Sequence, residues 1–358
     1  MSDQILFGLS PRVAAVVVGA VIGVAFGALA QRTHFCLRRG IAGQPDERQS
    51  ALGIWAMALA ISLLGSAVLW TTGAVDFTHH RLFAARLPVV AVLVGGLLFG
   101  AGMVLARGCA SRLTVLAGTG NLRALTVLLV FALVAHAALK GVLAPVRTGL
   151  GAFAVNIGVL ATPSAWPGGS LFWATLIGLA LVIGALRSGA RWAGLFGGAA
   201  IGALAPLAWL ATGWLLRDEF DPIPLESIAF TSAGAESLFW WVASSAIPPT
   251  FGVGFLAGVV SGSFLAAVAS SEFRLVGFSD ATPTGHYLAG GALMGLGGVL
   301  AGGCTVGAGL AGAGALSLAA ALALLAIIAG GVMTASLMRG DWALRSSRLP
   351  RLRAAGNG

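Results

Sequence analysis

Long, almost uninterrupted apolar stretches dominate the chain and are separated by shorter polar segments. Each stretch is close to or above the ~18–20 residues with which a helix crosses the hydrocarbon of a bilayer. The alternation of apolar and polar residues that marks barrel strands is missing, and a helix satisfies its backbone hydrogen bonds within one segment. The pattern therefore predicts a polytopic α-helical membrane protein. The clearest expected spans are 13–30, 51–70, 121–139, 170–186, 192–216 and 315–338.

The composition excludes a water-soluble fold of this length. Of the 358 residues, 58% are hydrophobic and 9% are charged, whereas a soluble domain carries about 25% charged residues. The N-terminal segment MSDQILFGLSPR has neither the basic start nor the small-residue cleavage site of a signal peptide. The stretch 13–30 is therefore expected to be the first spanning helix.

Positive charge is concentrated in three places, and this distribution predicts an orientation. Arginines crowd the 31–50 connection, the turn at 187–191 and the tail after residue 338, whereas carboxylates gather in 217–236. Because Lys and Arg are retained on the cytoplasmic side, we expect the three basic segments inside and the acidic loop outside. The N-terminus is then outside, the C-terminus cytoplasmic and the number of spans odd. Juxtamembrane arginines account for the net charge of +9, so nucleic-acid binding is not expected.

An internal repeat is the most informative feature of the sequence. GGLLFGAGMVLARGC (95–109) and GGALMGLGGVLAGGC (290–304) match without a gap at a separation of 195 residues. Six glycine or cysteine positions coincide, including the final Gly-Cys pair. Repeat-built transporters place broken helices and substrate sites where two such halves meet, and glycine permits the dihedrals of a break. We therefore expect a half-helix, a turn at each Gly-Cys pair and a second half-helix.

These features together predict an all-α polytopic membrane protein with two pseudo-symmetric repeats. We expect about nine transmembrane helices plus short re-entrant half-helices. Prolines should interrupt the helices that connect the two halves. The predicted regions are a first half at 1–140 with a hairpin at 95–125, connecting helices and an external loop at 141–250, a second half at 251–338 with a hairpin at 290–315, and a basic cytoplasmic tail at 339–358.

Three cysteines could carry chemistry. Cys109 and Cys304 follow Gly108 and Gly303 at equivalent places of the repeat. A buried cysteine is often only a small apolar core residue, but this equivalence favours a function. A thiol is a soft group that can meet a polarizable sulfur, and a nearby helix N-terminus would favour an anion. Cys36 follows the first span beside arginines that would favour its thiolate, and an inert interfacial thiol is the alternative.

Arg107 and Arg112 flank Cys109 and are candidate binding residues. An arginine at membrane depth normally faces a cavity or a partner. No carboxylate lies within 95–125 to pair with either side chain, so an anionic ligand is the predicted partner. Snorkelling of the guanidinium to the membrane interface is the alternative.

Signals of other functions are scarce. None of the 12 carboxylates lies in the middle of a clear span, so a buried proton relay has no obvious carrier. His136 lies in a span and is expected to be a core histidine, whereas His79 and His80 are expected to be solvated in an external loop. Metalloprotease, hydrolase, dinucleotide and P-loop motifs are missing, and the cysteine spacing favours neither zinc nor a disulfide framework. We predict no enzyme activity, metal or cofactor.

Several separate motifs resemble the YeeE/YedE-type sulfur transport family: ARGCASR, AGGCTVGAG, HFCLRRG after the first helix and FSDATPTGH ahead of the second repeat. The resemblance covers most of the chain and implies a permease of the bacterial inner membrane. It implies that cysteines mark a narrow path and hand on thiosulfate through its terminal sulfur. The matching positions are Cys36, Cys109 and Cys304. It also implies a small soluble sulfur-carrier protein as a separate partner.

We therefore predict import of thiosulfate or a similar small sulfur-containing anion. A cation such as Arg107 or Arg112 would attract the charge. Cys109 would receive the sulfur on one side, Cys304 would lie near the centre, and Cys36 would pass it inward. The alternatives are transport of a different sulfur or selenium compound, a membrane thiol oxidoreductase with Cys109 and Cys304 as its redox pair, and a structural membrane partner with inert cysteines.

Overall fold

The computed structural model describes residues 10–217, 222–277 and 281–348. Within these ranges it is helical almost throughout, and one short antiparallel sheet pairs β1 (Arg86–Leu87) with β2 (Val155–Asn156). The acidic positions 218, 219 and 221, part of the FSDATPTGH motif and the tail beyond residue 348 lie outside the described residues.

Nine helical segments of the described chain are long and apolar enough to cross a membrane. The prediction of an all-α polytopic protein with about nine spanning helices is confirmed. The nine segments are Pro11–Ala42, Pro45–Thr72, Val89–Gly118, Leu122–Lys140, Gly169–Leu186, Trp192–Leu215, Phe251–Ala269, Thr284–Ala315 and Leu318–Arg339.

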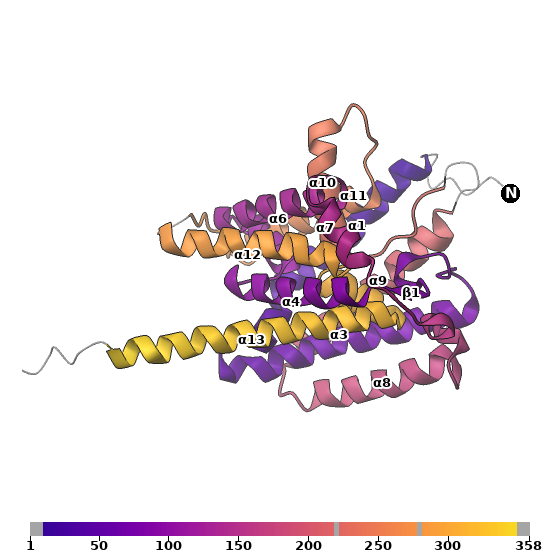
Figure 1. The fold of residues 1–358 in the computed structure, drawn as a ribbon, viewed down its shortest axis with the longest axis horizontal. Coiled ribbons are helices and arrows are strands. Elements are labelled where there is room, and N and C mark those ends of the chain that lie inside the picture. Colours follow the sequence, from indigo (N-terminus) through magenta and orange to yellow (C-terminus); the bar gives the residue numbers. More distant parts are fainter. Residues whose placement is uncertain (1–9, 218–221, 278–280, 349–358) are drawn as a thin grey trace, which may run out of the picture.

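Most of the long helices run along the longest axis of the molecule (Figure 1). The start of α1 lies near the strands, at what we call the β1 end, and α13 reaches the opposite, α13 end (Figure 1). The α-helices are α1 (Pro11–Thr33), α2 (Leu37–Ala42), α3 (Pro45–Thr72), α4 (Val89–Leu105), α5 (Ala110–Gly118), α6 (Leu122–Lys140), α7 (Ala144–Gly151), α8 (Gly169–Leu186), α9 (Trp192–Leu210), α10 (Phe230–Ala243), α11 (Phe251–Ala269), α12 (Ala281–Leu300) and α13 (Leu318–Arg348). The shorter helical segments are η2 (Arg81–Phe83), η3 (Gly158–Ala161), η4 (Pro163–Ala165), η5 (Ala211–Leu215), η6 (Thr305–Gly312) and η7 (Ala313–Ala315).

Local sequence signals set several helix ends. α3 begins with Pro45 at a position where its missing N–H costs nothing, and carboxylates occupy its first turn. It ends at Gly73 in the left-handed conformation that glycine adopts readily. The side chain of Asn121 accepts a hydrogen bond from Ala124 N–H at 3.0 Å and so caps α6.

Glycine stripes allow the backbones of α1 and α11 to touch. The stripe on α1 comprises Gly19, Gly23 and Gly27, and the one on α11 comprises Gly254, Gly258 and Gly262. A Cβ added to Gly23 would clash with the Phe255 carbonyl, and one added to Gly258 would clash with the Ala20 carbonyl. Small residues commonly bring membrane helices into such close contact. A helix from the first half is thus locked against one from the second.

The two copies of the predicted repeat make reciprocal contacts. A Cβ on Gly95 of α4 would lie 2.7 Å from the carbonyl oxygen of Gly297. A Cβ on Gly290 of α12 would lie 2.7 Å from the carbonyl oxygen of Gly102. Gly290 is the repeat equivalent of Gly95, and Gly297 is the equivalent of Gly102. Each contact is therefore the equivalent of the other, as a pseudo-two-fold axis requires. The repeat and its re-entrant half-helices remain predictions, and this reciprocity supports the first of them.

Candidate functional site

Three of the nine candidate spans are interrupted, and each interruption carries one cysteine. The chain passes from α1 to α2 at Cys36, from α4 to α5 at Cys109, and from α12 to η6 at Cys304. Each cysteine immediately precedes the second helix and has an extended backbone. All three thiols therefore lie at helix N-termini inside the bundle, where exposed N–H groups carry partial positive charge.

The backbone follows one pattern at all three breaks. The residue two positions before each cysteine is left-handed, with φ of 50° at His34, 56° at Arg107 and 76° at Gly302. Such a residue is a common way to end a helix, and glycine adopts it without the cost that other residues incur. After His34 and Arg107, the N–H of the next residue reaches back to a carbonyl five residues earlier at 3.1 Å. A left-handed residue, one spacer and a cysteine thus make each break.

Cys36 and Cys109 meet although they come from different breaks. Their thiols lie within hydrogen-bonding reach of each other. The Sγ atom of Cys109 also lies 3.2 Å from Ser111 Oγ and within reach of the Thr305 hydroxyl. Cys36 is 6% exposed and Cys109 is 1% exposed, and both are free thiols. The pair is therefore sealed from bulk solvent among hydroxyl groups.

Cys304 is linked to this pair through Thr305, the next residue in the chain. It immediately precedes Thr305, whose hydroxyl reaches Cys109. Its Sγ accepts a hydrogen bond from Gly307 N–H at 3.3 Å, and its side chain is fully buried as a free thiol. Cys304 and Cys109 are close enough to interact electrostatically. The three thiols consequently follow one another in the order Cys304, Cys109, Cys36.

A cavity of about 730 Å³ lies against the break that holds Cys304. Gly302, Gly303 and Gly307 form part of its lining, so the cavity lies beside the chain segment that contains Cys304. The other walls come from the loop before β1, the end of α6, and the segment that leads into α10. Of the three breaks, the one that holds Cys304 is therefore the one that contributes to the wall of the cavity.

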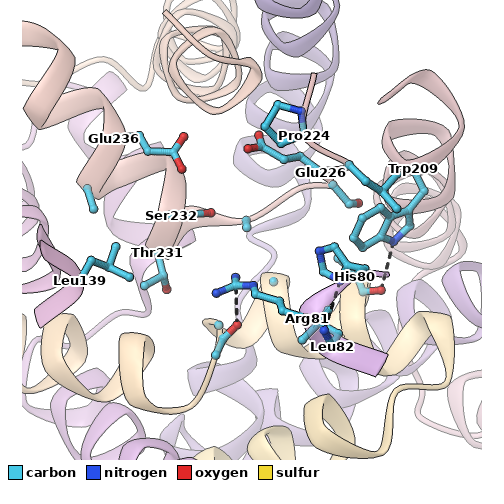
Figure 2. A pocket seen from close by; sticks show the side chains of 18 of the residues that line it. His80, Arg81, Leu82, Leu139, Trp209, Pro224, Glu226, Thr231, Ser232 and Glu236 are labelled. Carbon is cyan, nitrogen blue, oxygen red and sulfur yellow. Dashed lines mark hydrogen bonds between the residues drawn. The ribbon is translucent and has the colours of Figure 1, made fainter. Parts of the chain in front are cut away.

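Ionisable side chains face each other across this cavity. Figure 2 shows Arg81 reaching in from one side, while Glu226 and Glu236 project from the opposite side. The Nη2 group of Arg81 donates to the Gly302 carbonyl at 3.4 Å, which holds the guanidinium beside the break. His80, next to it, accepts a hydrogen bond from Leu82 N–H through Nδ1 at 3.3 Å.

Burial sets the pKa values around the cavity. It lowers the pKa of His80 to about 4, with help from Arg81, so this imidazole is neutral at neutral pH. Burial and the neighbouring Glu236 raise the pKa of Glu226 to about 8. Burial also raises the pKa of Glu236, against a hydrogen bond from Thr250. Burial in the protein disfavours the charged form of a group that lacks a close partner of opposite charge.

Two histidine predictions need correction. His79 is exposed, but His80 is not a solvated residue, because its ring packs 5.0 Å from that of Trp209. His136 is not a simple core residue: it stacks on Phe239 at 4.6 Å and lines the cavity. His80 packs against Trp209 of α9, and His136 packs against Phe239 of α10. Both are contacts between segments far apart in the chain, which local sequence does not reveal.

A polar network lies on the other side of the thiols. Arg112 is close enough to Cys36 and Cys109 to interact electrostatically with both. Its Nη1 group donates to Gln31 Oε1 at 3.4 Å, and Gln31 Nε2 donates to Glu272 Oε2 at 2.7 Å. Arg112 has no carboxylate in its own sequence segment, but the side-chain amide of Gln31 connects it to the carboxylate of Glu272.

Of the two arginines beside Cys109 in the sequence, the structure brings only Arg112 to the thiols. Arg107 is exposed and points its guanidinium toward the Tyr287 ring, 5.7 Å from the centroid. Arg123 lies over the same ring at 4.6 Å. Gly108 and Gly303 are the spacers of their breaks, and Gly303 also lines the cavity.

In the part of the chain that the structure describes, no group of three or more His, Cys, Asp or Glu side chains is placed to hold a metal ion. The site consists instead of soft thiols, hydroxyl groups and a few cations. Cations and hydroxyl donors can bind an anion, and a thiol can contact a polarizable sulfur.

A multi-pass helical membrane protein with buried thiols behind a charged cavity is the class that the fold and site define. A sequence model described as sulphur transport matches residues 32–333, and the chain belongs to this family. The family resemblance predicted from the cysteine motifs is confirmed. The chain is also 29% identical, over 307 residues, to the thiosulfate transporter TsuA of Escherichia coli (strain K12). The aligned region covers 78% of this chain and 82% of that protein.

Proposed function

We propose that the chain is a permease, and not an enzyme, that imports thiosulfate or a similar small sulfur-containing anion across the bacterial inner membrane. The observation that carries this proposal is the convergence of three buried thiols, from three broken helices, behind a charged cavity. Membership of the sulphur transport family and similarity to a thiosulfate transporter support it.

The proposed orientation follows from the distribution of arginine. With the basic 31–50 connection and tail in the cytoplasm, the C-terminus is cytoplasmic and the N-terminus periplasmic. The β1 end, with the cavity, then faces the periplasm. Arg81 would offer an incoming anion a positive charge beside the Cys304 break, because its guanidinium donates to the Gly302 carbonyl there.

The thiols suit the substrate for physical reasons. Sulfur is polarizable and weakly hydrated, so a thiol can contact the terminal sulfur of thiosulfate at a smaller desolvation cost than a strongly hydrated group. The three helix N-termini favour negative charge at the same points. The contacts are proposed to be noncovalent, with the anion moving from one thiol to the next.

We propose a different order of the thiols from the one that the sequence suggested. The sequence suggested that Cys109 receives the sulfur and Cys304 lies near the centre. Because the cavity lies against the Cys304 break and Cys36 lies beyond Cys109, we propose Cys304 first, Cys109 second and Cys36 last. Arg112 would then draw the anion onward from the last two thiols. A separate sulfur-carrier protein would receive it on the cytoplasmic side.

The proposal is tested by uptake of labelled thiosulfate into cells that lack other sulfate and thiosulfate importers. Cells that express the chain should accumulate label well above cells with an empty vector. Competition by unlabelled selenium and sulfur oxyanions in the same assay identifies the preferred ion. No accumulation of any of these anions, with the protein present in the membrane, would reject the proposal.

The contact between Cys36 and Cys109 makes a further prediction. A mild oxidant such as copper phenanthroline should join these two thiols, because they already lie within hydrogen-bonding reach. Uptake should then fall and recover after reduction, and peptide mass spectrometry should find the Cys36–Cys109 bridge with Cys304 free. The residual uptake of a Cys36→Ala variant should not respond to the oxidant.

The same experiment addresses the oxidoreductase alternative. A bridge between Cys109 and Cys304 that forms and breaks during turnover would favour a thiol oxidoreductase over a permease. An oxidant that leaves uptake unchanged, or a bridge at a different pair of thiols, would contradict the order of thiols proposed above.

A further inference from the structure

The cavity holds two carboxyl groups that the proposed thiol path does not use. Glu226 lies in the segment that leads into α10, and Glu236 lies on α10 itself. Both line the cavity opposite Arg81 (Figure 2). An anion in this cavity would therefore lie near two acidic side chains, which in their ionised form would repel it.

Hydrogen bonds hold the backbone of Glu226 and the carboxylate of Glu236. The backbone N–H of Glu226 donates to Thr212 Oγ1 at 3.1 Å, and the same hydroxyl donates to the Glu226 carbonyl at 2.7 Å. The Glu236 carboxylate accepts from Thr250 Oγ1 at 2.9 Å through Oε2. Within the described residues neither carboxylate forms an ion pair with Arg81, although all three interact electrostatically. The acid pair and the cation thus remain apart across an open space.

The cavity also presents an unsatisfied hydroxyl group. Thr231 lines it and is 5% exposed, and its Oγ1 atom has no hydrogen-bond partner. A buried polar atom without a partner is costly, so a ligand oxygen near Thr231 would relieve a cost that the protein alone leaves in place. Arg81 and Thr231 together offer an anion a charge and a hydroxyl donor.

Other ionisable groups also face this space. Burial keeps the pKa of His80 at about 4. Hydrogen bonds from Thr78 lower the pKa of Asp76, which stays ionised near neutral pH. The remaining groups that line the cavity are His79, His136, Lys140 and Arg147. Arg147 is already engaged, because it donates to the carbonyls of Ala138 and Leu139.

The pair is placed to change charge near neutral pH. The pKa of Glu226 is raised to about 8, and that of Glu236 is raised as well. Below about pH 8 the Glu226 carboxyl is mainly neutral, and above it the carboxylate forms. The repulsion of an anion is therefore weak at low pH and grows as pH rises.

We propose that Glu226 and Glu236 form a proton-binding pair on the inward route, so that the cavity binds its anion together with a proton. This rests on the proposed function, because the anion is the one that moves toward Cys304. A bound anion stabilises the neutral acid pair, and a neutral pair stabilises the bound anion; the two effects are reciprocal. The proton comes from the solvent and is held by a carboxylate oxygen of the pair.

The test is thiosulfate binding to the purified full chain in detergent, measured by calorimetry. Between about pH 7 and about pH 9 the affinity of the wild type should fall by roughly tenfold. Near about pH 8 the binding heat should depend on the ionisation enthalpy of the buffer, which reports proton uptake. The double variant Glu226→Gln, Glu236→Gln should bind with little dependence on pH or buffer. Asp76→Asn, which alters an acid of the same cavity, should keep the wild-type profile.

The outcomes separate this inference from the proposed function. Wild-type binding without pH or buffer dependence overturns the proton pair while leaving the permease intact. A profile that persists in the double variant also overturns it, because the proton is then bound by another group. The buffer measurement on the wild type needs no variant, so the inference stays testable if the double variant does not fold. No thiosulfate binding at any pH would count against the permease and the proton pair together.

Discussion

We expect the Cys304→Ala variant to lose thiosulfate uptake by about tenfold or more, equivalent to at least ~1.4 kcal/mol of lost stabilisation along the path. Cys304 is the thiol nearest the cavity, and its Sγ lies at the start of η6, where Gly307 N–H already points at it. Its removal leaves no soft group between the cavity and Cys109. The measurement is initial uptake of labelled thiosulfate in cells at matched membrane expression.

The control for this prediction is a substitution that changes the packing next to Cys304 and leaves the thiol in place. Val306→Ala removes a side chain that is 1% exposed and lies two residues from Cys304, so it reports damage to the break without loss of a thiol. We expect it to retain most of the uptake, and we expect Cys109→Ala to behave like Cys304→Ala. Equal uptake by Cys304→Ala and wild type would mean that the thiol only fills space.

The second large effect concerns the spacer glycine of the same break. A Cβ at Gly303 would lie 2.7 Å from the backbone N of Ala308, in η6. Backbone cannot rotate away as a side chain can, so η6 and Cys304 would have to shift. We expect Gly303→Ala to destabilise the folded protein by roughly 1–3 kcal/mol and to abolish uptake. Thermal unfolding in detergent and the cell uptake assay measure the two effects.

The repeat supplies a matched control for this substitution. Gly108 is the spacer of the equivalent break, and a Cβ there would lie 3.3 Å from Cδ2 of Leu113, the flexible end of a side chain. Neither glycine has a left-handed φ, so alanine is acceptable to the backbone at both. We expect Gly108→Ala to unfold and transport nearly as the wild type does. Equal sensitivity of the two positions would contradict this steric account.

The fold was largely predictable because its main determinant is local. Apolar stretches of bilayer length need no long-range contact to be recognised, and they marked six clear spans. The helices that carry Cys109 and Cys304 were not among those six spans. The repeat located them instead, and it pointed to both Gly-Cys breaks. The break at Cys36 has the same backbone pattern, but His34 in the left-handed position gives no sequence signal comparable to glycine.

The site was predictable only in part, since its walls depend on contacts between distant segments. The three cysteines were identified, but the placement of Thr305 between two of them requires the three-dimensional fold. Arg107 and Arg112 look equivalent in sequence, and only the fold separates them. The Glu226 and Glu236 pair was assigned to an external loop. One sequence feature could have indicated a buried acid here. Glu236 lies in the largely apolar stretch IAFTSAGAESLFWWVA, which predicts a carboxyl group in an apolar environment.

The most direct test of the central claim is transport by the purified chain alone. Liposomes that contain either the wild type or Cys304→Ala, at equal protein density, would be given labelled thiosulfate outside and assayed for label inside. The account predicts accumulation in wild-type liposomes well above protein-free liposomes and almost none with the variant. Equal flux through both proteins would contradict a thiol-marked path, and no flux through the wild type would contradict the permease itself.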